Sequence, residues 1–503
     1  MLATLLPAVL TAGAVATLAA WVRVGPERTI ELREPEDRKQ AVADTRERPL
    51  VAEIDVFGDA ATPAGPAAVG DWPQFRGPRR DGIAHDAPRL ARSWPESGPP
   101  KLWTVELGEG HAGAAVRDDR VYVLDYLRDA EADALRCFSL ADGNELWRLS
   151  YPVSIKRNHG MSRTVPAVSA DYIVGFGPKC HVSLVQRRQS DAPPQADNSL
   201  SQPNAPPQDD NSLSEKNAGR APSLNGVVLI DLTTRFGTTV PPWYAGQCPL
   251  IDDGRIILAP GGDALMVALD PSTGDVIWAT PNPDGWKMTH SSIVPMDFAG
   301  RRTLVYCADD GVVGVDAATG ELLWKTSEWR ISIATCPSPV VIPDGRLFFS
   351  GGYNSGAMIM QLVERDGKIV PSVERRLGPR EFGSTQHTPI LHDGHLYGVR
   401  EHDGQLVCLD LNGDVVWQSG REHRFGLGPY LIARQPDDAA ALIFVLNDDG
   451  RLTLAEATPT GYNQLAAADV LDGHDAWAPM AMAGDRLIVR DLTSMVCLNV
   501  GDQ

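Results

Sequence analysis

The chain has 503 residues and a formal net charge of −19 at pH 7, with 43% hydrophobic and 22% charged residues. This composition is that of an ordinary globular protein, and the acidic balance without a basic patch argues against a nucleic-acid-binding protein. The seven cysteines stand singly, so the sequence contains neither a CxxC zinc motif nor a CxxCH haem motif. Most of them are expected to be small apolar residues of strands.

The first segment, Met1 to Val22, contains no charged side chain and is long enough to cross a bilayer or to form the core of a signal peptide. Basic residues follow it rather than precede it, which by the positive-inside rule would keep the body of the chain in the cytoplasm. Small residues at Ala14, Ala16 and Ala20 instead suit a cleavage site for export. We interpret residues 1–22 as a transmembrane anchor or signal, with the body on the periplasmic side of the cell envelope.

Two later segments are expected to be disordered. Residues 23–70 are charged and then rich in Ala, Pro and Gly, and this composition predicts a linker because it offers too little apolar material for a core. Residues 187–226 contain the tandem repeat "APPQADNSLSQPN" and "APPQDDNSLSEKN", which predicts a low-complexity loop. The folded domain is therefore expected over residues 71–503, with the loop 187–226 inserted into it.

One short motif recurs along this domain, with a Gly followed four residues later by a Trp. It reads "GNELW", "GDVIW", "GELLW" and "GDVVW". The tryptophans recur at roughly 45 residues or multiples of that interval, which is the period of a β-propeller blade. We expect each Trp on the outermost strand of a blade, where a large ring fills the gap between adjacent sheets. These blade-docking residues are Trp103, Trp147, Trp278, Trp324 and Trp417.

The order of segments within each period is also regular. A short strand of small residues, often with Pro, comes first, then an apolar strand, a strand ending in Asp, and the Trp strand. Pro suits the innermost strand because that edge needs no N–H donor. The inner strands begin near Gly113, Pro166, Pro249, Ile293, Pro339, Pro389, Pro429 and Pro479.

The last period has no Trp strand, whereas a spare one, around Trp103, precedes the first period. Joining the two ends would complete the last blade and close the ring. The pattern therefore predicts an all-β fold, an eight-bladed propeller of four-stranded antiparallel blades closed by an N-terminal strand. The loop 187–226 falls within blade 2.

The phrases "DWPQFRGPRRDG" from Asp71, "VPPWYAGQCPLIDDGRIILAPGG" and "HTPILHDGHLYGV" resemble the pyrroloquinoline quinone (PQQ)-binding-like β-propeller repeats. This is the quinoprotein alcohol dehydrogenase-like superfamily of WD-like repeats, and the opening phrase looks like that of planctomycete-type envelope proteins. The resemblance covers residues 71–503 and implies one of two functions.

The first kind of family member is a quinoprotein dehydrogenase, which holds PQQ and Ca²⁺ in the central channel beside a carboxylate base. The adjacent cysteines that accompany the cofactor in that group are absent from this chain. The second kind is a non-catalytic binding platform, such as the lipoprotein component of the outer-membrane β-barrel assembly machinery. We expect a protein- or peptide-binding scaffold of the cell envelope without cofactor or metal, and the alternative is an alcohol or sugar oxidoreductase using PQQ and Ca²⁺.

Candidate ligand residues lie just before the inner strands, where they should point toward the channel axis or the top face. They are Arg163, Gln247, His290, Gln386, His387 and Trp477, together with His111. In one interpretation Arg163, Gln247 and the histidines hold an anionic ligand. In the other, polar side chains merely line a wet channel and satisfy backbone groups at strand edges.

Three further features allow two interpretations each, and a fourth, His159, allows one. Asp309 and Asp310 suit either a Ca²⁺ site or a plain turn. "PQFRGP", with Phe75 and Arg76, either binds a partner or plugs one face of the ring. His159 is expected to be solvated. The remaining aromatic residues suit sugar stacking, although their positions beside the blade starts favour packing; they are Trp243, Tyr244 and Trp286.

Overall fold

The structure is a computed structural model that describes residues 55–58, 70–187, 227–436 and 440–502. The predicted anchor, most of the predicted linker and nearly all of the low-complexity loop lie outside these residues. Among the residues that are described, no helix is both long and apolar enough to cross a membrane. The account below concerns the compact unit from Ala52 to Gln503.

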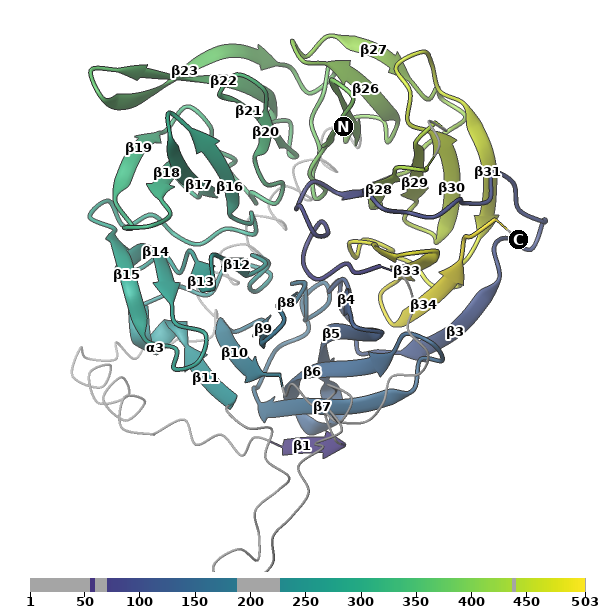
Figure 1. The fold of residues 1–503 in the computed structure, drawn as a ribbon, viewed down its shortest axis with the longest axis horizontal. Coiled ribbons are helices and arrows are strands. Elements are labelled where there is room, and N and C mark those ends of the chain that lie inside the picture. The colour runs from purple at the N-terminus through teal and green to yellow at the C-terminus, as the bar shows by residue number, and fades with distance from the viewer. Residues whose placement is uncertain (1–54, 59–69, 188–226, 437–439, 503) are drawn as a thin grey trace, which may run out of the picture. The chain divides into compact units, whose positions relative to one another are not determined.

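The described part of this unit forms eight sheets arranged as the blades of a ring (Figure 1). Blades 1 to 4 follow in chain order. Their strands are β4 (Ala115–Arg117), β5 (Arg120–Leu127), β6 (Ala132–Ser139) and β7 (Glu145–Pro152) in blade 1; β8 (Ala167–Val168), β9 (Tyr172–Phe176), β10 (His181–Gln186) and β11 (Val227–Asp231) in blade 2; β12 (Leu250–Asp252), β13 (Arg255–Leu258), β14 (Ala264–Leu269) and β15 (Val276–Pro281) in blade 3; β16 (Val294–Phe298), β17 (Arg301–Ala308), β18 (Gly311–Asp316) and β19 (Leu322–Thr326) in blade 4.

The second half of the ring repeats the same order. Its strands are β20 (Val340–Ile342), β21 (Arg346–Gly351), β22 (Gly356–Arg365) and β23 (Lys368–Leu377) in blade 5; β24 (Ile390–His392), β25 (His395–Val399), β26 (Leu406–Asp410) and β27 (Val415–Gln418) in blade 6; β28 (Tyr430–Ala433), β29 (Leu442–Leu446), β30 (Arg451–Glu456) and β31 (Gln464–Asp469) in blade 7; β32 (Ala481–Ala483), β33 (Arg486–Arg490) and β34 (Ser494–Asn499) with β3 (Lys101–Glu106) in blade 8.

The ring closes through strand β3, which pairs antiparallel with β34 and places Trp103 opposite Cys497. The prediction of eight four-stranded antiparallel blades closed by an N-terminal strand is confirmed. Each predicted inner-strand start lies just before an observed innermost strand. Two short helical turns, η1 (Arg128–Ala130) and α3 (Leu232–Phe236), accompany the strands.

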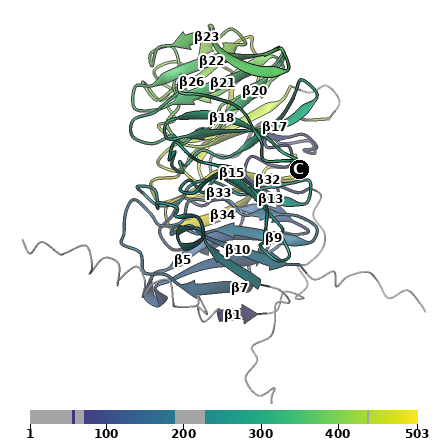
Figure 2. The same cartoon turned by 90° about the vertical axis from the view of Figure 1, so that its left-hand side faces the viewer.

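Two short strands join the blades from outside the repeat. Strand β1 (Asp55–Gly58) pairs antiparallel with β7 as a fifth strand at the outer edge of blade 1, where Figure 2 shows it from the side. These four residues lie within the segment 23–70, for which the sequence predicted only a linker. Strand β2 (Ile83–Ala84) pairs in parallel with the inner strand β28 of blade 7.

The Gly–Trp motif joins neighbouring blades. The indole Nε1 of Trp278, on the outer strand of blade 3, donates to the carbonyl oxygen of Ala317 in blade 4, at 3.2 Å. The motif glycine Gly320 has a φ of +75° and lies directly against that indole, so a Cβ there would be 2.6 Å from a ring atom. The Gly of one motif thus receives the Trp of the preceding blade.

The same contact recurs elsewhere in the ring. Trp103 of blade 8 donates to the carbonyl oxygen of Leu140 in blade 1 at 2.8 Å and packs on Gly143. Trp417 of blade 6 donates to Thr458 in blade 7 at 2.8 Å. Trp147 and Trp324 are buried on the outer strands of blades 1 and 4. All five predicted docking tryptophans therefore lie on outer strands, and those at 103, 278 and 417 hydrogen-bond to the next blade.

The cysteines are all free thiols, and six of them are buried. Cys137, Cys408 and Cys497 each lie directly opposite a docking Trp in the neighbouring strand. Ala268 and Gly314 occupy the corresponding positions opposite Trp278 and Trp324. The shared property is small size, which leaves room for the indole, so these cysteines act as small apolar strand residues.

Residues 71–90, here called the strap, cross the channel at the centre of the ring. Trp72 forms a β-bridge with Val116 of blade 1, and the carbonyl oxygen of Pro73 accepts from the N–H of Val168 in blade 2 at 2.8 Å. The strap then reaches blade 7 through β2, and Leu90 bridges to Gly501. Figure 1 shows this segment, in dark purple, across the centre of the ring.

Candidate functional site

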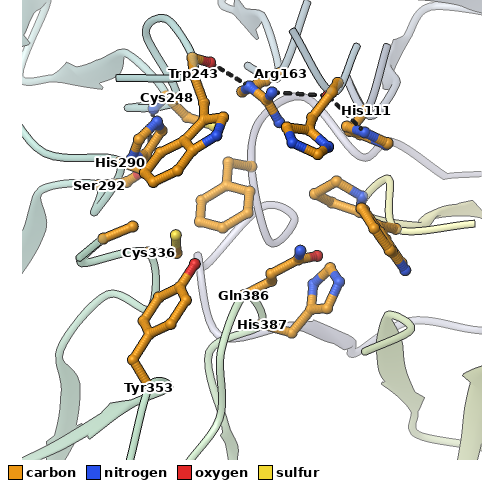
Figure 3. A pocket seen from close by; sticks show the side chains of 16 residues that line it. His111, Arg163, Trp243, Cys248, His290, Ser292, Cys336, Tyr353, Gln386 and His387 are labelled. Atoms are coloured by element: carbon orange, nitrogen blue, oxygen red, sulfur yellow. Dashed lines mark hydrogen bonds between the residues drawn. The ribbon is translucent and has the colours of Figure 1, made fainter. Parts of the chain in front are cut away.

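A pocket of about 310 Å³ occupies the mouth of the channel (Figure 3). Most of its lining comes from the loops that lead from the outermost strand of one blade to the innermost strand of the next. The lining residues are Phe75, His111, His159, Arg163, Trp243, Gly246, Cys248, His290, Ser292, Ala334, Cys336, Tyr353, Gln386, His387, Trp477 and Pro479. The pocket therefore gathers side chains from widely separated parts of the sequence.

A chain of hydrogen bonds from blade to blade fixes these loops. The N–H of Cys248 donates to Ser292 Oγ at 3.0 Å, and the N–H of Ser292 donates to Ser338 Oγ at 3.0 Å. The N–H of Ser338 donates in turn to Thr388 Oγ1 at 2.8 Å. Each acceptor stands directly before the first residue of an inner-strand segment. Because these donors and acceptors are buried, each bond satisfies a backbone group that would otherwise be left unpaired.

The strap provides the floor of the pocket. Phe75 is one of the lining residues. Its neighbour Arg76 is held below by the backbone of blade 6, since Nη1 donates to the carbonyl oxygen of Thr388 at 2.6 Å and Nη2 to that of Pro389 at 3.0 Å. "PQFRGP" thus has the geometry of a plug rather than of an exposed partner-binding segment.

Arg163 carries the positive charge of the pocket. Its Nε donates to the carbonyl oxygen of Trp243 at 2.5 Å, and its Nη2 donates to that of His159 at 2.7 Å. Its Nη1 has no hydrogen-bond partner among the described residues. Burial lowers the pKa of Arg163 to about 10, so the guanidinium remains charged at neutral pH. The lining contains no Asp or Glu to neutralise it.

Three histidines of the lining are neutral at pH 7. Burial, followed by the charge of Arg163, lowers the pKa of His111 to about 3 and that of His290 to about 4. Burial and the charge of Arg76 lower the pKa of His387 to about 4. Within the described part of the chain, His111 Nδ1 and His387 Nε2 are buried without a hydrogen-bond partner. These rings can therefore donate or accept hydrogen bonds without adding charge.

The remaining predicted residues of the pocket are Gln386 and Trp477. Both line it, and Figure 3 shows Gln386 beside His387, across the pocket from Arg163. The indole Nε1 of Trp477 donates to Asp448 Oδ1 at 2.8 Å, and its ring centroid lies 5.1 Å from that of His111. The hydrogen bond holds this indole as part of the wall.

Gln247 is a correction to the predicted site, because it does not line the pocket. It is fully buried, and its side-chain amide pairs with the backbone of Ala259 in both directions, at 2.8 and 3.3 Å. Its neighbours Gly246 and Cys248 do line the pocket. Successive residues of extended chain point to opposite sides, so the residue between them turns into the blade.

The other sequence candidates have mainly structural partners. Asp309 accepts from the N–H of Lys287, and Asp310 pairs with Arg330 at 3.2 Å. The part of the chain that is described contains no cluster of His, Cys, Asp and Glu able to hold a metal ion. Among the aromatic candidates, Trp243 lines the pocket whereas Trp286 is buried.

Several lining residues belong to no earlier candidate set, among them Cys336, Tyr353 and Ser292. Cys336 and Ser292 could have been found, since each precedes an inner strand as the other candidates do. Tyr353 lies in the turn between β21 and β22 and has a φ of +57°. No periodic signal marks it, because that turn is irregular within the repeat.

The lining does not suit the cofactor pair of the quinoprotein enzymes. Ca²⁺ takes six to eight oxygen ligands, usually with carboxylates among them. The pocket offers no carboxylate as a Ca²⁺ ligand or as a general base, and its polar groups are imidazoles, a guanidinium, an amide, hydroxyls and thiols. This set suits the binding of an anion but supplies neither a carboxylate ligand for Ca²⁺ nor a carboxylate base.

The fold and the site together define a β-propeller with a cationic pocket at the mouth of its channel. Residues 227–419 match the family model of the outer membrane protein assembly factor BamB. This match and the eight-bladed ring together fit a PQQ-binding-like β-propeller.

Other comparisons add less. The chain is similar to the computationally designed Ika8 protein at 12% identity and a TM-score of 0.46, covering 80% of this chain and 100% of that one. It is also similar to Sqt1 of Saccharomyces cerevisiae at 10% identity and a TM-score of 0.47, with the same coverage. Identities and scores at this level say nothing about function. No curated protein matches the chain.

Proposed function

We propose that this protein is a non-catalytic binding platform that holds a protein or peptide partner at the mouth of its channel. The observation that carries the proposal is the pocket, which combines a half-buried guanidinium, three neutral imidazoles and aromatic walls with no carboxylate. Such a site suits an anionic group and offers no carboxylate as a general base or metal ligand. The blade-to-blade hydrogen bonds hold the lining in place, so little ordering is required when a ligand binds.

The cell envelope is the setting that we propose for this partner. The apolar segment 1–22 suits an anchor or an export signal, and the matching family model is that of an outer membrane assembly factor. An acidic body without a basic patch is consistent with a protein rather than a nucleic acid as partner. The body would lie on the periplasmic side, with its top face free to meet other envelope proteins.

In-cell photocrosslinking tests this function. The photoreactive amino acid p-benzoylphenylalanine is placed at Ile333, which is 52% exposed on the top face beside the pocket. The matched control places it at Ile277, which is 47% exposed on the outer strand β15. We expect the full-length protein to form a discrete crosslinked adduct from position 333 and not from position 277.

Mass spectrometry of the adduct identifies the partner and its compartment. A discrete adduct with an envelope protein supports the proposal. Crosslinking that is equal at the two positions, or an adduct only with cytoplasmic proteins, contradicts it.

A further inference from the structure

We propose that the channel-mouth pocket recognises the carboxyl-terminal residue of an extended peptide whose last side chain is apolar. This inference rests on the proposed function and deepens it, since it names the part of the partner that enters the pocket. Three observations carry it, concerning the charge of the pocket, its walls and its continuation into a groove.

The charge requires an anion. The two guanidinium nitrogens of Arg163 that are bonded donate only to backbone carbonyl oxygens, and Nη1 is left without a partner in the described structure. A half-buried cation without a carboxylate partner has lost part of its hydration, and a ligand carboxylate would offset that cost by accepting a charge-assisted hydrogen bond. The side-chain amide of Gln386, on the opposite wall, provides a second donor group.

The walls favour an apolar group next to that carboxylate. Four aromatic residues line the pocket, namely Phe75, Trp243, Tyr353 and Trp477. His290 and His111 are uncharged there and make a polar but neutral contribution. A guanidinium beside aromatic walls fits one carboxylate and one apolar side chain, which is the chemistry of a carboxyl-terminal Leu, Val or Phe.

The pocket continues into a groove of about 850 Å³ on the same face. The walls of the two share His290 and Ala334, so the groove adjoins the pocket. The groove has apolar walls at Pro241, Pro242 and Ile333.

The segment from Ile331 to Ala334 borders this groove and bends at Ser332 and Ile333. No N–H of these four residues has a hydrogen-bond partner in the part of the chain that is described, and Ser332 and Ile333 are exposed. Unpaired backbone beside a groove suits an extended peptide, which can supply the missing acceptors. A free carboxylic acid would leave the groove empty, and the groove therefore favours a peptide over a small acid.

The experiment is a fluorescence-polarisation titration of the full-length protein in mild detergent. The probe is fluorescein-labelled Gly-Ser-Val-Thr-Leu with a free carboxyl group, compared with the same peptide as the carboxamide. We expect the carboxamide peptide to bind at least about tenfold more weakly, because it cannot form the charge-assisted hydrogen bond between a terminal carboxylate and the Arg163 guanidinium. Arg163→Gln should weaken binding of the acid peptide by a similar factor and leave the affinity for the carboxamide peptide unchanged.

Two controls separate recognition from misfolding. Arg451→Gln removes an exposed arginine on the outer strands of blade 7, where it pairs with Asp469, and should leave both affinities unchanged. The comparison of acid with amide on the unaltered protein does not depend on any variant folding.

A further variant tests the groove. Ile333→Asp should weaken binding of the acid peptide while leaving the pocket intact.

The outcomes distinguish this inference from the proposed function. Equal affinity for acid and amide overturns carboxylate recognition but leaves a peptide-binding platform. N-acetyl-leucine competing as tightly as the pentapeptide overturns the peptide and indicates a small acid as ligand. Failure of both peptides to bind also overturns the inference, while the photocrosslinking at Ile333 independently decides the proposed function.

Discussion

Gly320 of blade 4 lies against the indole of Trp278 of blade 3, closely enough that a Cβ would come within 2.6 Å of the ring. The indole N–H completes the contact by donating to Ala317 in the same turn. Gly143 receives Trp103 in the same way, so at these two junctions the motif glycine of one blade lies against the Trp of the blade before it. At Gly274 and Gly413 the neighbours in that position are Ile230 and Leu377.

Gly320→Ala is expected to destabilise the ring through this contact. The left-handed φ alone costs about 1 kcal/mol for a residue with a Cβ, and displacement of the indole adds about 1–3 kcal/mol. Gly394→Ala is a matched control, because Gly394 has a φ of +74° and no atom within 4 Å of an added Cβ. Thermal unfolding should show a clearly larger loss for Gly320→Ala, and equal losses would mean that the indole contact contributes nothing.

Thr388→Val tests the blade-to-blade hydrogen bonds. It keeps the shape of a buried side chain but removes the acceptor for the N–H of Ser338, which should cost about 1–3 kcal/mol. Thr303→Val is the control, because Thr303 is buried and its hydroxyl has no partner in the described structure. We expect this second change to be neutral or stabilising in chemical denaturation. A neutral Thr388→Val would contradict a role for these bonds in holding the pocket loops.

Asp133 should make stability depend on pH. It is fully buried in blade 1, where Tyr151 donates to its Oδ2 at 2.5 Å, and burial raises its pKa to about 7. A raised folded-state pKa means that the folded protein binds the proton more tightly. Stability is therefore greatest below the unfolded-state pKa of about 4 and falls as pH rises toward and through about 7.

Asp133→Asn should remove this pH dependence. Relative to the unaltered protein, the variant should gain more stability at pH 8 than at pH 5. Chemical denaturation at the two pH values measures the effect. Asp270→Asn is a contrast, because hydrogen bonds from Ser272 lower the pKa of that exposed carboxylate, so its contribution is the same at both pH values and is lost only at lower pH. An unchanged pH profile in Asp133→Asn would show that Asp133 does not titrate in this window.

The sequence predicted the fold well because each blade repeats the same local requirements. Pro marks an innermost edge that needs no N–H, and the Gly–Trp spacing marks the contact between blades. The spare strand at Trp103 showed how the ring closes. In contrast, β1 and the path of the strap depend on tertiary contacts such as Arg76 with Thr388, to which no periodic pattern corresponds.

The same repeat placed most of the candidate site, since residues before inner strands converge on the channel mouth. It failed at Gln247, where the alternation of extended chain turns the side chain inward. It also could not find Tyr353, which comes from the turn between β21 and β22 and not from the loops before inner strands. Whether a residue faces the pocket depends on one-residue differences in register that a repeat of roughly 45 residues does not resolve.

The most direct test of a binding platform, as opposed to a quinoprotein enzyme, is a titration with PQQ in the presence and absence of Ca²⁺. The fluorescence of Trp243 and Trp477, which line the pocket, reports occupancy in the full-length protein. Because the lining offers no carboxylate ligand for Ca²⁺, we predict no quenching that depends on the metal. Saturable, Ca²⁺-dependent quenching at micromolar PQQ would contradict the account and make the oxidoreductase the better description.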